Sequence, residues 1–411
     1  MRKSILICVL FLFLTSTSSV FAQVKAIYFG RVIDGHGKIL TDAVIITNAD
    51  RIVAVGAENS IEIPANAKII DLRRYTAIPG LIDAHTHMTY YWDKKRGGDP
   101  WGQLGTLGPA MTVFLAQENA LKTLETGVTT VRDLGSFDGM DFSMRDLINS
   151  GDMKGPRMFI AGRGLSIRNS KGKEAVQQFA KDQIELGADW IKMYGSTGSA
   201  NDVTGTQTFS FGEMKAAVDV AHQAGKRISI HSYGPDGAVA AMKAGANTIE
   251  HATGLADSTL IEMSRLGTIY VPTVGHNKYY ISHRDEYGYD SAVVNNLTDY
   301  INRNLETLKK AIKANVKIAM GSDAVFTGFG ENTQELEWFV KAGMTPEQAL
   351  RTATTIGAQM LGLENDLGAI APGYFADIVA VEGDPLKDIG VIINKVKWVM
   401  KAGKVEINKI K

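Results

Sequence analysis

The amino-acid sequence predicts an α/β protein in which a (β/α)8 TIM barrel is joined to a small β-sandwich domain built from both ends of the chain. Two observations predict this fold. Short apolar segments alternate with helical patterns through the middle of the chain, whereas β-branched runs separated by turn residues fill its two ends. The 411-residue chain is 45% hydrophobic and 21% charged, an ordinary composition for a globular protein with a large core.

We expect residues 1–22 to form a signal peptide that is removed on export. Arg2 and Lys3 precede the apolar run Ile5–Leu14, and Val20–Ala22 is a small-residue cleavage pattern. The run is too short to span a bilayer comfortably. The alternative, a buried N-terminal helix, would place two cations before a helix that has no polar face. The mature protein is therefore expected to be periplasmic or secreted, with no stable membrane span.

Charge and cysteine content exclude two further classes. Lys and Arg together equal Asp and Glu at 44 each, so no overall basic field invites nucleic acid, and we expect no nucleic-acid partner. Cys8 is the single cysteine and lies within the expected signal peptide. The mature chain can then form neither disulfides nor a cysteine-based zinc site, so any metal must be held by His and oxygen ligands.

The β-sandwich domain is expected to combine residues 23–78 with residues 367–411. In the first part, Val44–Thr47 and Ile52–Val55 are β-branched runs bounded by turn residues. The second part resumes the pattern with expected strands at Ile378–Val381, Val391–Ile393 and Val396–Met400, followed by a turn at Lys401–Gly403.

Residues 79–366 are expected to form the barrel. The eight segments that we expect to be its strands are Gly80–His85, Val128–Leu134, Met158–Leu165, Trp190–Tyr194, Ile228–Ser232, Thr248–His251, Ile269–Val274 and Ile318–Ser322. Helical patterns occupy the connections, as in Val113–Thr126, Phe211–Gly225 and Leu297–Asn315. Thr345, Pro346 and Gln348 predict a helix start with a capping box. Eight such β-then-α units are typical of a TIM barrel.

Candidate metal ligands stand where these strands end. His85 and His87 close the first strand, and residues i and i+2 of a strand point the same way, so both imidazoles can reach one ion. An isolated pair of this kind is often incidental. However, the carboxyl ends of barrel strands carry the active sites of such enzymes, which favours a metal site.

Three further strand ends carry ligand chemistry. His231 ends the fifth strand, His251 the sixth, and Asp323 follows the eighth. A single such residue would most often be a satisfied core or capping residue. Several on one face of a barrel favour a metal centre.

Lys192 lies inside the apolar fourth strand, where an ammonium is costly unless it is paired or modified. Beside divalent cations it would also be repelled, and a carbamate formed with CO2 would remove both problems. The alternative is a lysine whose side chain extends to the barrel mouth.

The ligand order on strands one, four, five, six and eight resembles that of binuclear amidohydrolases with a carboxylated lysine. The flanking segments resemble the prolidase-like, Xaa-dipeptidase and imidazolonepropionase-related branch, in the stretches Val131–Gly135, Ala188–Tyr194, Gly343–Leu350 and Gly368–Asp377. The sequence departs from this branch in two substrate-facing loops, Trp92–Gly108 and Gly275–Asn277, so the resemblance bears on the metal chemistry more than on the substrate.

The resemblance implies two divalent metal ions. One would be held by His85, His87 and Asp323, the other by His231 and His251, with the carbamate of Lys192 between them. Zinc suits this set, although cobalt, manganese and nickel bind the same residue types. A hydroxide between the metals would attack a carbonyl, Asp323 would act as general acid and base, and Tyr233 would donate to the carbonyl oxygen. Tyr233 and His276 are the candidate substrate contacts.

Three functions remain open at this point. The first is cleavage of a small amide, a dipeptide or an N-acyl-amino acid, because barrel loops enclose a pocket rather than an extended groove. The second is an esterase or lactonase using the same centre. The third is an exported metal-binding protein without turnover, against which the carboxylate of Asp323 argues. The sequence leaves homo-oligomerisation open.

Overall fold

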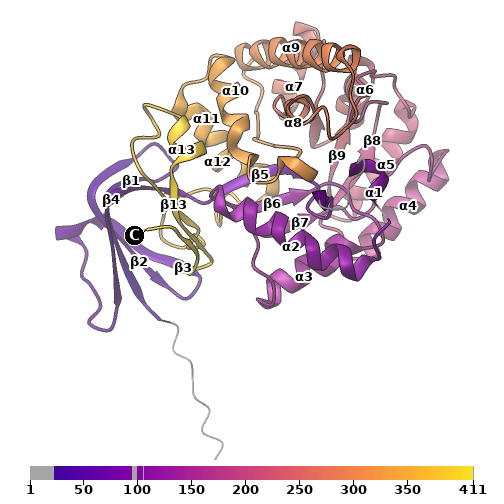
Figure 1. Ribbon diagram of the computed structural model, residues 1–411. Helices are drawn as coiled ribbons and strands as arrows, with labels where there is room; N and C mark the ends of the chain where they lie inside the picture. The colour runs from indigo at the N-terminus through magenta and orange to yellow at the C-terminus, as the bar shows by residue number, and fades with distance from the viewer. Residues whose placement is uncertain (1–22, 95–99, 105, 411) are drawn as a thin grey trace, which may run out of the picture.

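The computed structural model describes residues 23–94, 100–104 and 106–410. A β-rich region built from both ends of the chain lies beside a larger region in which helices surround strands (Figure 1). The expected signal peptide, residues 1–22, lies outside the described residues, as do residues 95–99 and 105 of the loop at 92–108. In the part of the chain that is described, no helix has both the length and the apolar character needed to cross a membrane.

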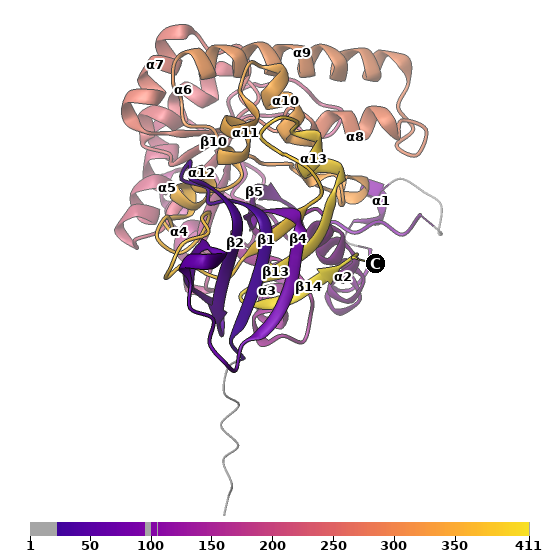
Figure 2. The same cartoon turned by 90° about the vertical axis from the view of Figure 1, so that its left-hand side faces the viewer.

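The two ends of the chain share one seven-stranded sheet in the order β14-β13-β12-β4-β1-β2-β3. Its strands are β1 (Lys25–Ile33), β2 (Ile39–Asn48), β3 (Arg51–Ala57), β4 (Lys68–Pro79), β12 (Ile378–Val381), β13 (Val396–Lys401) and β14 (Lys404–Asn408). The N-terminal and C-terminal parts meet where β12 runs antiparallel to β4. Figure 2 shows the indigo and yellow strands side by side.

This sheet curls back on itself. The backbone of Ile52 in β3 accepts from the amide of Gly373 at 2.8 Å and donates to the carbonyl of Tyr374 at 2.9 Å, just before β12 begins. The curled sheet encloses buried apolar side chains such as Phe29, Ile45 and Trp398. The described strands therefore form one continuous sheet around its own core, and a division into two packed sheets stays a prediction.

One expected strand of this region is wrong. Val391–Ile393 belongs to a short helix, α13 (Gly390–Asn394), because the side chain of Asp388 accepts from the amide of Gly390 at 2.8 Å and starts a turn. Three apolar residues are too few to distinguish the two periodicities. The expected turn after β13 is confirmed, with Ala402 and Gly403 at φ 47° and 72°.

The larger region contains parallel strands whose pairing forms a closed order. They are β5 (Leu81–Thr86), β6 (Val128–Asp133), β7 (Arg157–Ile160), β8 (Trp190–Tyr194), β9 (Arg227–His231), β10 (Thr248–Glu250) and β11 (Ile269–Val271). They form sheets β5-β6-β7 and β8-β9-β10-β11. Single parallel bridges connect these sheets, Leu165 with Met193 on one side and Tyr270 with Ile318 and Thr86 with Ala324 on the other. This arrangement is of the TIM-barrel type.

The eighth expected strand, Ile318–Ser322, is not a regular strand. Its backbone still pairs at alternate residues, as where Ala84 donates to Met320 at 2.7 Å. The regular backbone pairing then ends, because the carboxylate of Asp83 accepts a hydrogen bond from the amide of Ser322 at 2.9 Å. The next residue, Asp323, has a left-handed φ of 51°. The segment closes the ring while its end is bent toward the interior.

Helices follow the strands along the chain, and most of them cover the outside of these strands (Figure 1). They are α1 (Pro100–Gln103), α2 (Pro109–Glu125), α3 (Met140–Ser150), α4 (Lys173–Glu185), α5 (Phe211–Gln223), α6 (Pro235–Ala244), α7 (Asp257–Leu266), α8 (His276–Ser282), α9 (Ser291–Lys313), α10 (Glu335–Lys341), α11 (Pro346–Thr352) and α12 (Thr355–Leu361). The predicted helices correspond to α2, α5 and α9, although α2 begins at Pro109 and α9 at Ser291, earlier than expected. The capping box of Thr345 and Gln348 at the start of α11 is confirmed.

A buried carboxylate connects the end sheet to the strands of the larger region. Asp377, just before β12, accepts from Arg157 of β7 at 2.8 Å, from the hydroxyl of Thr129 in β6 at 3.1 Å and from the amide of Ala402 at 2.7 Å. Val379 and Val399 on the same face of the sheet join the main apolar core. The two regions therefore pack as one body.

Candidate metal centre

The structure brings all six candidate ligands to one cavity. His85 lies in β5 with His87 just after it, Lys192 lies in β8, His231 ends β9, His251 follows β10, and Asp323 follows the eighth segment. A cavity of about 60 Å³ is lined by all of them and by Tyr233 and His276. The parallel strands put their carboxyl ends on one face, which is why residues far apart in sequence meet here.

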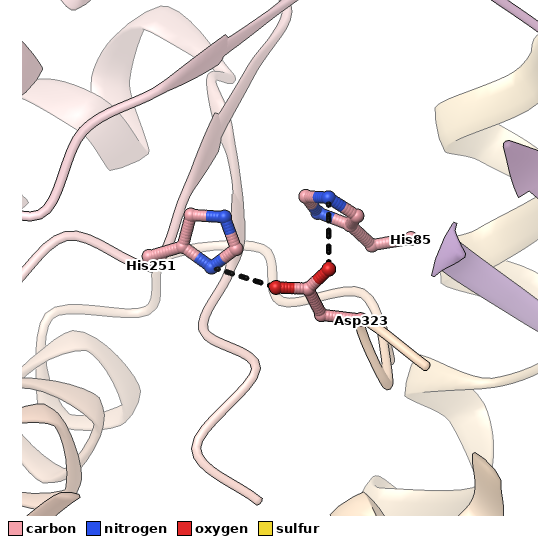
Figure 3. A group of neighbouring side chains, drawn as sticks. All are labelled: His85, His251 and Asp323. Carbon is pink, nitrogen blue, oxygen red and sulfur yellow. Dashed lines mark ion pairs between the residues drawn. The ribbon is translucent and has the colours of Figure 1, made fainter. Parts of the chain in front are cut away.

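Asp323 is the centre of this group. Its Oδ1 lies 3.5 Å from Nε2 of His85 and 3.3 Å from Nε2 of His87, and its Oδ2 lies 3.9 Å from Nδ1 of His251. His85, His251 and Asp323 each offer a ligand atom within 4.8 Å of the others (Figure 3). His231 stands next to His251, with 4.7 Å between the ring centroids. Asp323 thus lies close to histidines from both groups that are expected to hold the two ions.

Three of the imidazoles are held in place by a neighbouring polar group at Nδ1. Nδ1 of His85 is 2.8 Å from Glu250, Nδ1 of His87 is 3.1 Å from the carbonyl of Gly135, and Nδ1 of His251 is 2.6 Å from the hydroxyl of Thr273. Such anchoring of one ring nitrogen is usual for metal-ligating histidines.

Two of the Nε2 ring nitrogens lack a hydrogen-bond partner among the described residues. Nε2 of His85 and Nε2 of His231 are buried, and neither finds a hydrogen-bond partner among the described residues. Burying a polar atom unpaired costs about 1–3 kcal/mol, so both atoms call for a ligand. The donor set fits divalent metal ions.

Lys192 is buried, at 1% exposure, and lines the same cavity as these rings. No carboxylate of the described residues forms an ion pair with it, and its Nζ lies 5.3 Å from the centroid of Tyr194. Burial lowers the pKa of Lys192 to about 8, while Glu250 and Asp323 act in the opposite direction. The ammonium form still predominates near neutral pH, but the neutral amine is much more abundant than in an ordinary lysine.

The carboxyl of Asp323 is held in its ionised form. Burial alone would raise its pKa, but His276, His85 and His87 together hold the pKa of Asp323 well below its usual range. Asp323 and His251 also adopt φ of 51° and 72°. Left-handed backbone is unfavourable for such residues and concentrates at functional sites, where the surrounding structure imposes it. Here it turns both side chains into the cavity.

The two expected substrate contacts lie differently. His276 begins α8 and contacts Asp323 twice, with Nδ1 2.7 Å from its carbonyl oxygen and Nε2 3.4 Å from its carboxylate. Tyr233 stacks on His231 with centroids 4.9 Å apart and on Tyr300 at 4.6 Å. His276 thus faces the carboxylate, whereas Tyr233 stands beside a ligand ring at the cavity wall.

The sequence analysis did not predict the buried ion pair between Arg132 and Glu250, which contacts the ligand His85. The carboxylate of Glu250 accepts a hydrogen bond from Arg132 at 2.9 Å and lies 2.8 Å from Nδ1 of His85. It also accepts hydrogen bonds from the hydroxyls of Ser229 and Thr248. Both charges are fully buried, and Arg132 also packs over Trp190. Burial raises the pKa of Glu250, but Arg132 and His85 outweigh this and lower it. The sequence feature that could have indicated this pair is the carboxylate of Glu250, directly before His251 in an apolar strand.

Comparison with known proteins agrees with this geometry. Residues 76–405 match the Amidohydrolase family. The ochratoxinase of Aspergillus niger is 29% identical over 93% of this chain and 87% of its own length. The imidazolonepropionase of Alkaliphilus metalliredigens is 22% identical over 90% of this chain and 92% of its own length. A solved structure of a Xaa-Pro dipeptidase with bound methionine superposes with a TM-score of 0.84 and 28% identity, covering 93% of this chain and 99% of that one.

These matches extend over nearly the whole chain, and they agree with the expectation drawn from the ligand order. The family is generally metal-dependent, which the His and Asp cluster supports. Its fold is of the TIM-barrel type, in accord with the closed order of parallel strands. The chain therefore belongs to the amidohydrolase family and is a hydrolase of C–N bonds.

Proposed function

We propose that this protein is an exported hydrolase with two divalent metal ions that cleaves a small amide, either a dipeptide or an N-acyl-amino acid. The observation that carries this proposal is the convergence of four imidazoles, a buried lysine and a carboxylate in one cavity of about 60 Å³. The relatives support the substrate class, because one of them is a Xaa-Pro dipeptidase solved with an amino acid bound.

The residues that would hold the two ions are those of the cavity. His85 and His87 face Asp323 on one side, and His231 and His251 stand on the other. When bound, the ions, for which zinc suits this ligand set, would polarise the scissile carbonyl and make water nucleophilic near neutral pH.

Lys192 would hold the two ions together as a carbamate. The neutral amine is the form that reacts with CO2, and the lowered pKa of this buried side chain supplies it. Carboxylation of the neutral amine releases a proton and would leave two oxygens that share one negative charge, which is the kind of ligand that two neighbouring cations can share.

Asp323 and Tyr233 would carry out the proton transfers and the orientation of substrate. The ionised carboxylate of Asp323 can accept a proton from the attacking water and deliver it to the departing nitrogen. Burial raises the pKa of Tyr233, so its hydroxyl stays protonated and can donate a hydrogen bond to the carbonyl oxygen. His276 would hold Asp323 in place through its two contacts.

A substrate screen tests this function. The mature chain, reconstituted with zinc and bicarbonate, is assayed against Xaa-dipeptides, N-acyl-amino acids, esters, lactones and a long polypeptide. We expect release of a free amino acid from dipeptides or N-acyl-amino acids. Turnover of esters or lactones alone would contradict the amide substrate, and internal cleavage of the polypeptide without action on dipeptides would contradict the small substrate. Two bound metals without any turnover would leave only a binding role.

A further inference from the structure

A second, larger cavity opens beside the metal centre. It has a volume of about 570 Å³ and lies among the loops that follow β6, β7 and β8. Tyr90, Tyr194 and Ser199 line both this cavity and the smaller one around the ligands. The volume is within the range of small-molecule sites. A substrate that reacts at the metal centre can therefore extend into it.

The described lining of this cavity carries a net positive charge. Arg163 and Arg168, both exposed, line it, and neither guanidinium forms an ion pair within the described ranges. The one carboxylate among the described lining residues is Asp202, and its Oδ1 accepts from the amide of Thr204 at 2.9 Å and from its hydroxyl at 2.6 Å. The two guanidinium groups are thus available to a ligand anion.

The loop that carries both arginines is held firmly. The side chain of Asn169 accepts from the amide of Ser166 and donates to the carbonyl of Gly164, each at 2.9 Å. Gly164 lies so close to the ring of Tyr194 that an added Cβ would stand 2.5 Å from it. The bracing fixes Arg163 next to the wall shared by the two cavities. A preformed site loses less freedom when it binds.

Part of the cavity lining is apolar. Phe137 and Ile167 line it and remain 41% and 48% exposed. The ring of Phe137 stacks on that of Tyr90, with centroids 5.9 Å apart, so the aromatic surface continues toward the metal centre. Exposed apolar side chains inside a cavity offer contact to an apolar ligand group.

We propose that Arg163 and Arg168 bind the free carboxylate of an amide substrate whose apolar group packs on Phe137 and Ile167. A guanidinium presents paired N–H donors that match a carboxylate, which makes this contact specific as well as strong. The protein would then select carboxylate-bearing amides with a large apolar or aromatic side chain. This inference rests on the proposed function.

The test compares two substrates that differ only in the carboxylate. N-acetylphenylalanine and N-acetylphenethylamine are assayed by release of the amine, with wild type and with the double variant Arg163→Gln, Arg168→Gln. We expect wild type to prefer the acid by roughly 100-fold in kcat/KM, which is the scale of a lost charged contact. The double variant should lower this ratio at least about tenfold, mainly through a higher KM for the acid. Arg265→Gln, an exposed arginine of α7 outside the cavity, is the matched control and should keep the ratio.

The outcomes separate this inference from the function on which it rests. If wild type cleaves neither these compounds nor any other small amide, the proposed function fails. If wild type cleaves amides and either shows no preference for the acid or keeps its preference in the double variant, the arginine inference is overturned and the function stands. An equal loss on both substrates would also overturn it, because the arginines would then support the loop rather than bind the carboxylate. Melting temperatures of the variants check that the fold is kept.

Discussion

Lys192 differs from the other candidate ligands because the role proposed for it requires carboxylation of its side chain. Lys192→Ala should therefore lose one of two metals and nearly all turnover, because a short neutral side chain provides neither charge nor bridging oxygens. Metal content by elemental analysis and kcat on a cleavable substrate measure both effects. Lys181→Ala, on the exposed side of α4, is the matched control.

Small carboxylic acids provide the complementary experiment. Acetate or propionate can occupy the space left by the lysine and should restore part of the metal content and activity of Lys192→Ala. Reconstitution of metal-free wild type should also depend on bicarbonate. An alanine variant with two metals per chain and ordinary turnover would show that Lys192 has no such role.

Asp323 lies between the two groups of histidines and is the proposed proton acceptor. Asp323→Asn should lower kcat by about 10²–10⁴-fold, because the amide can still lie beside a metal but cannot take a proton. Circular dichroism should show an intact fold, and Asp299→Asn on the exposed face of α9 should keep full activity. Near-normal kcat in Asp323→Asn would remove this residue from proton transfer.

Glu250 neutralises Arg132 and orients His85, so its replacement should affect both stability and metal affinity. Glu250→Gln should cost about 3–5 kcal/mol in free energy of unfolding, because Arg132 keeps a buried charge without its partner. It should also weaken metal binding about 10–100-fold, as expected when the group behind a ligand is lost. Urea unfolding of the metal-free protein measures the first effect and competition with a chelator the second. Unchanged values for both would mean that the pair is not needed.

For individual residues, the sequence could predict which side chains at strand ends face the site, because the period of a strand fixes the direction of each side chain. His85 and His231 could be placed in this way, whereas Asp323 follows an irregular segment and has a left-handed φ of 51°. Glu250 and Arg132 could not, because their pairing joins β10 to β6 across the interior. Nothing along a single strand shows which residue lies opposite on another.

Among the helices, α11 offers the clearest test of a local signal. Thr345 accepts from the amide of Gln348, and the side chain of Gln348 accepts in return from the amide of Thr345. Thr345→Ala should lower the free energy of unfolding by about 1 kcal/mol. Thr298→Ala in α9, whose hydroxyl only bonds the carbonyl of Val294, should change it by less than about 0.5 kcal/mol. Equal losses measured in urea would contradict a specific capping effect.

The element predictions that failed have a common physical cause. Regular strands and helices repeat a period that a sequence can display, whereas the ends of elements depend on individual side chains. Asp83 ends the eighth segment by accepting a hydrogen bond from the amide of Ser322. Asp388 starts α13 by accepting one from the amide of Gly390. Each carboxylate competes with the backbone pairing that the apolar run alone would favour.

For the molecule as a whole, the centre should contribute to stability as well as to activity. Ligands that bind only the folded chain stabilise it, by about 2.7 kcal/mol when free metal is 100 times its dissociation constant. Removal of metal by a chelator should therefore lower the melting temperature, and addition of zinc should restore it. Calorimetry with and without zinc measures this. The same melting temperature in both states would contradict a bound metal at this site.

The joining of both chain ends was predictable because β-branched runs reappear after the helical middle. The single curled sheet was not, since it depends on the backbone of Ile52 meeting Gly373 and Tyr374. Pairings between residues that far apart follow from the packing of the whole chain. Composition and periodicity constrain only which segments are strands.

The shared end sheet also has a consequence for the order of events during synthesis. β1 to β4 leave the ribosome first, and β4 has β1 on one side but receives β12 on the other only after residue 381 has been made. Throughout translation of the intervening segment, one edge of β4 carries free amide and carbonyl groups, the kind of edge that pairs with strands of other nascent chains. The growing polypeptide must therefore be shielded, or must delay the folding of this edge, until its last strands arrive.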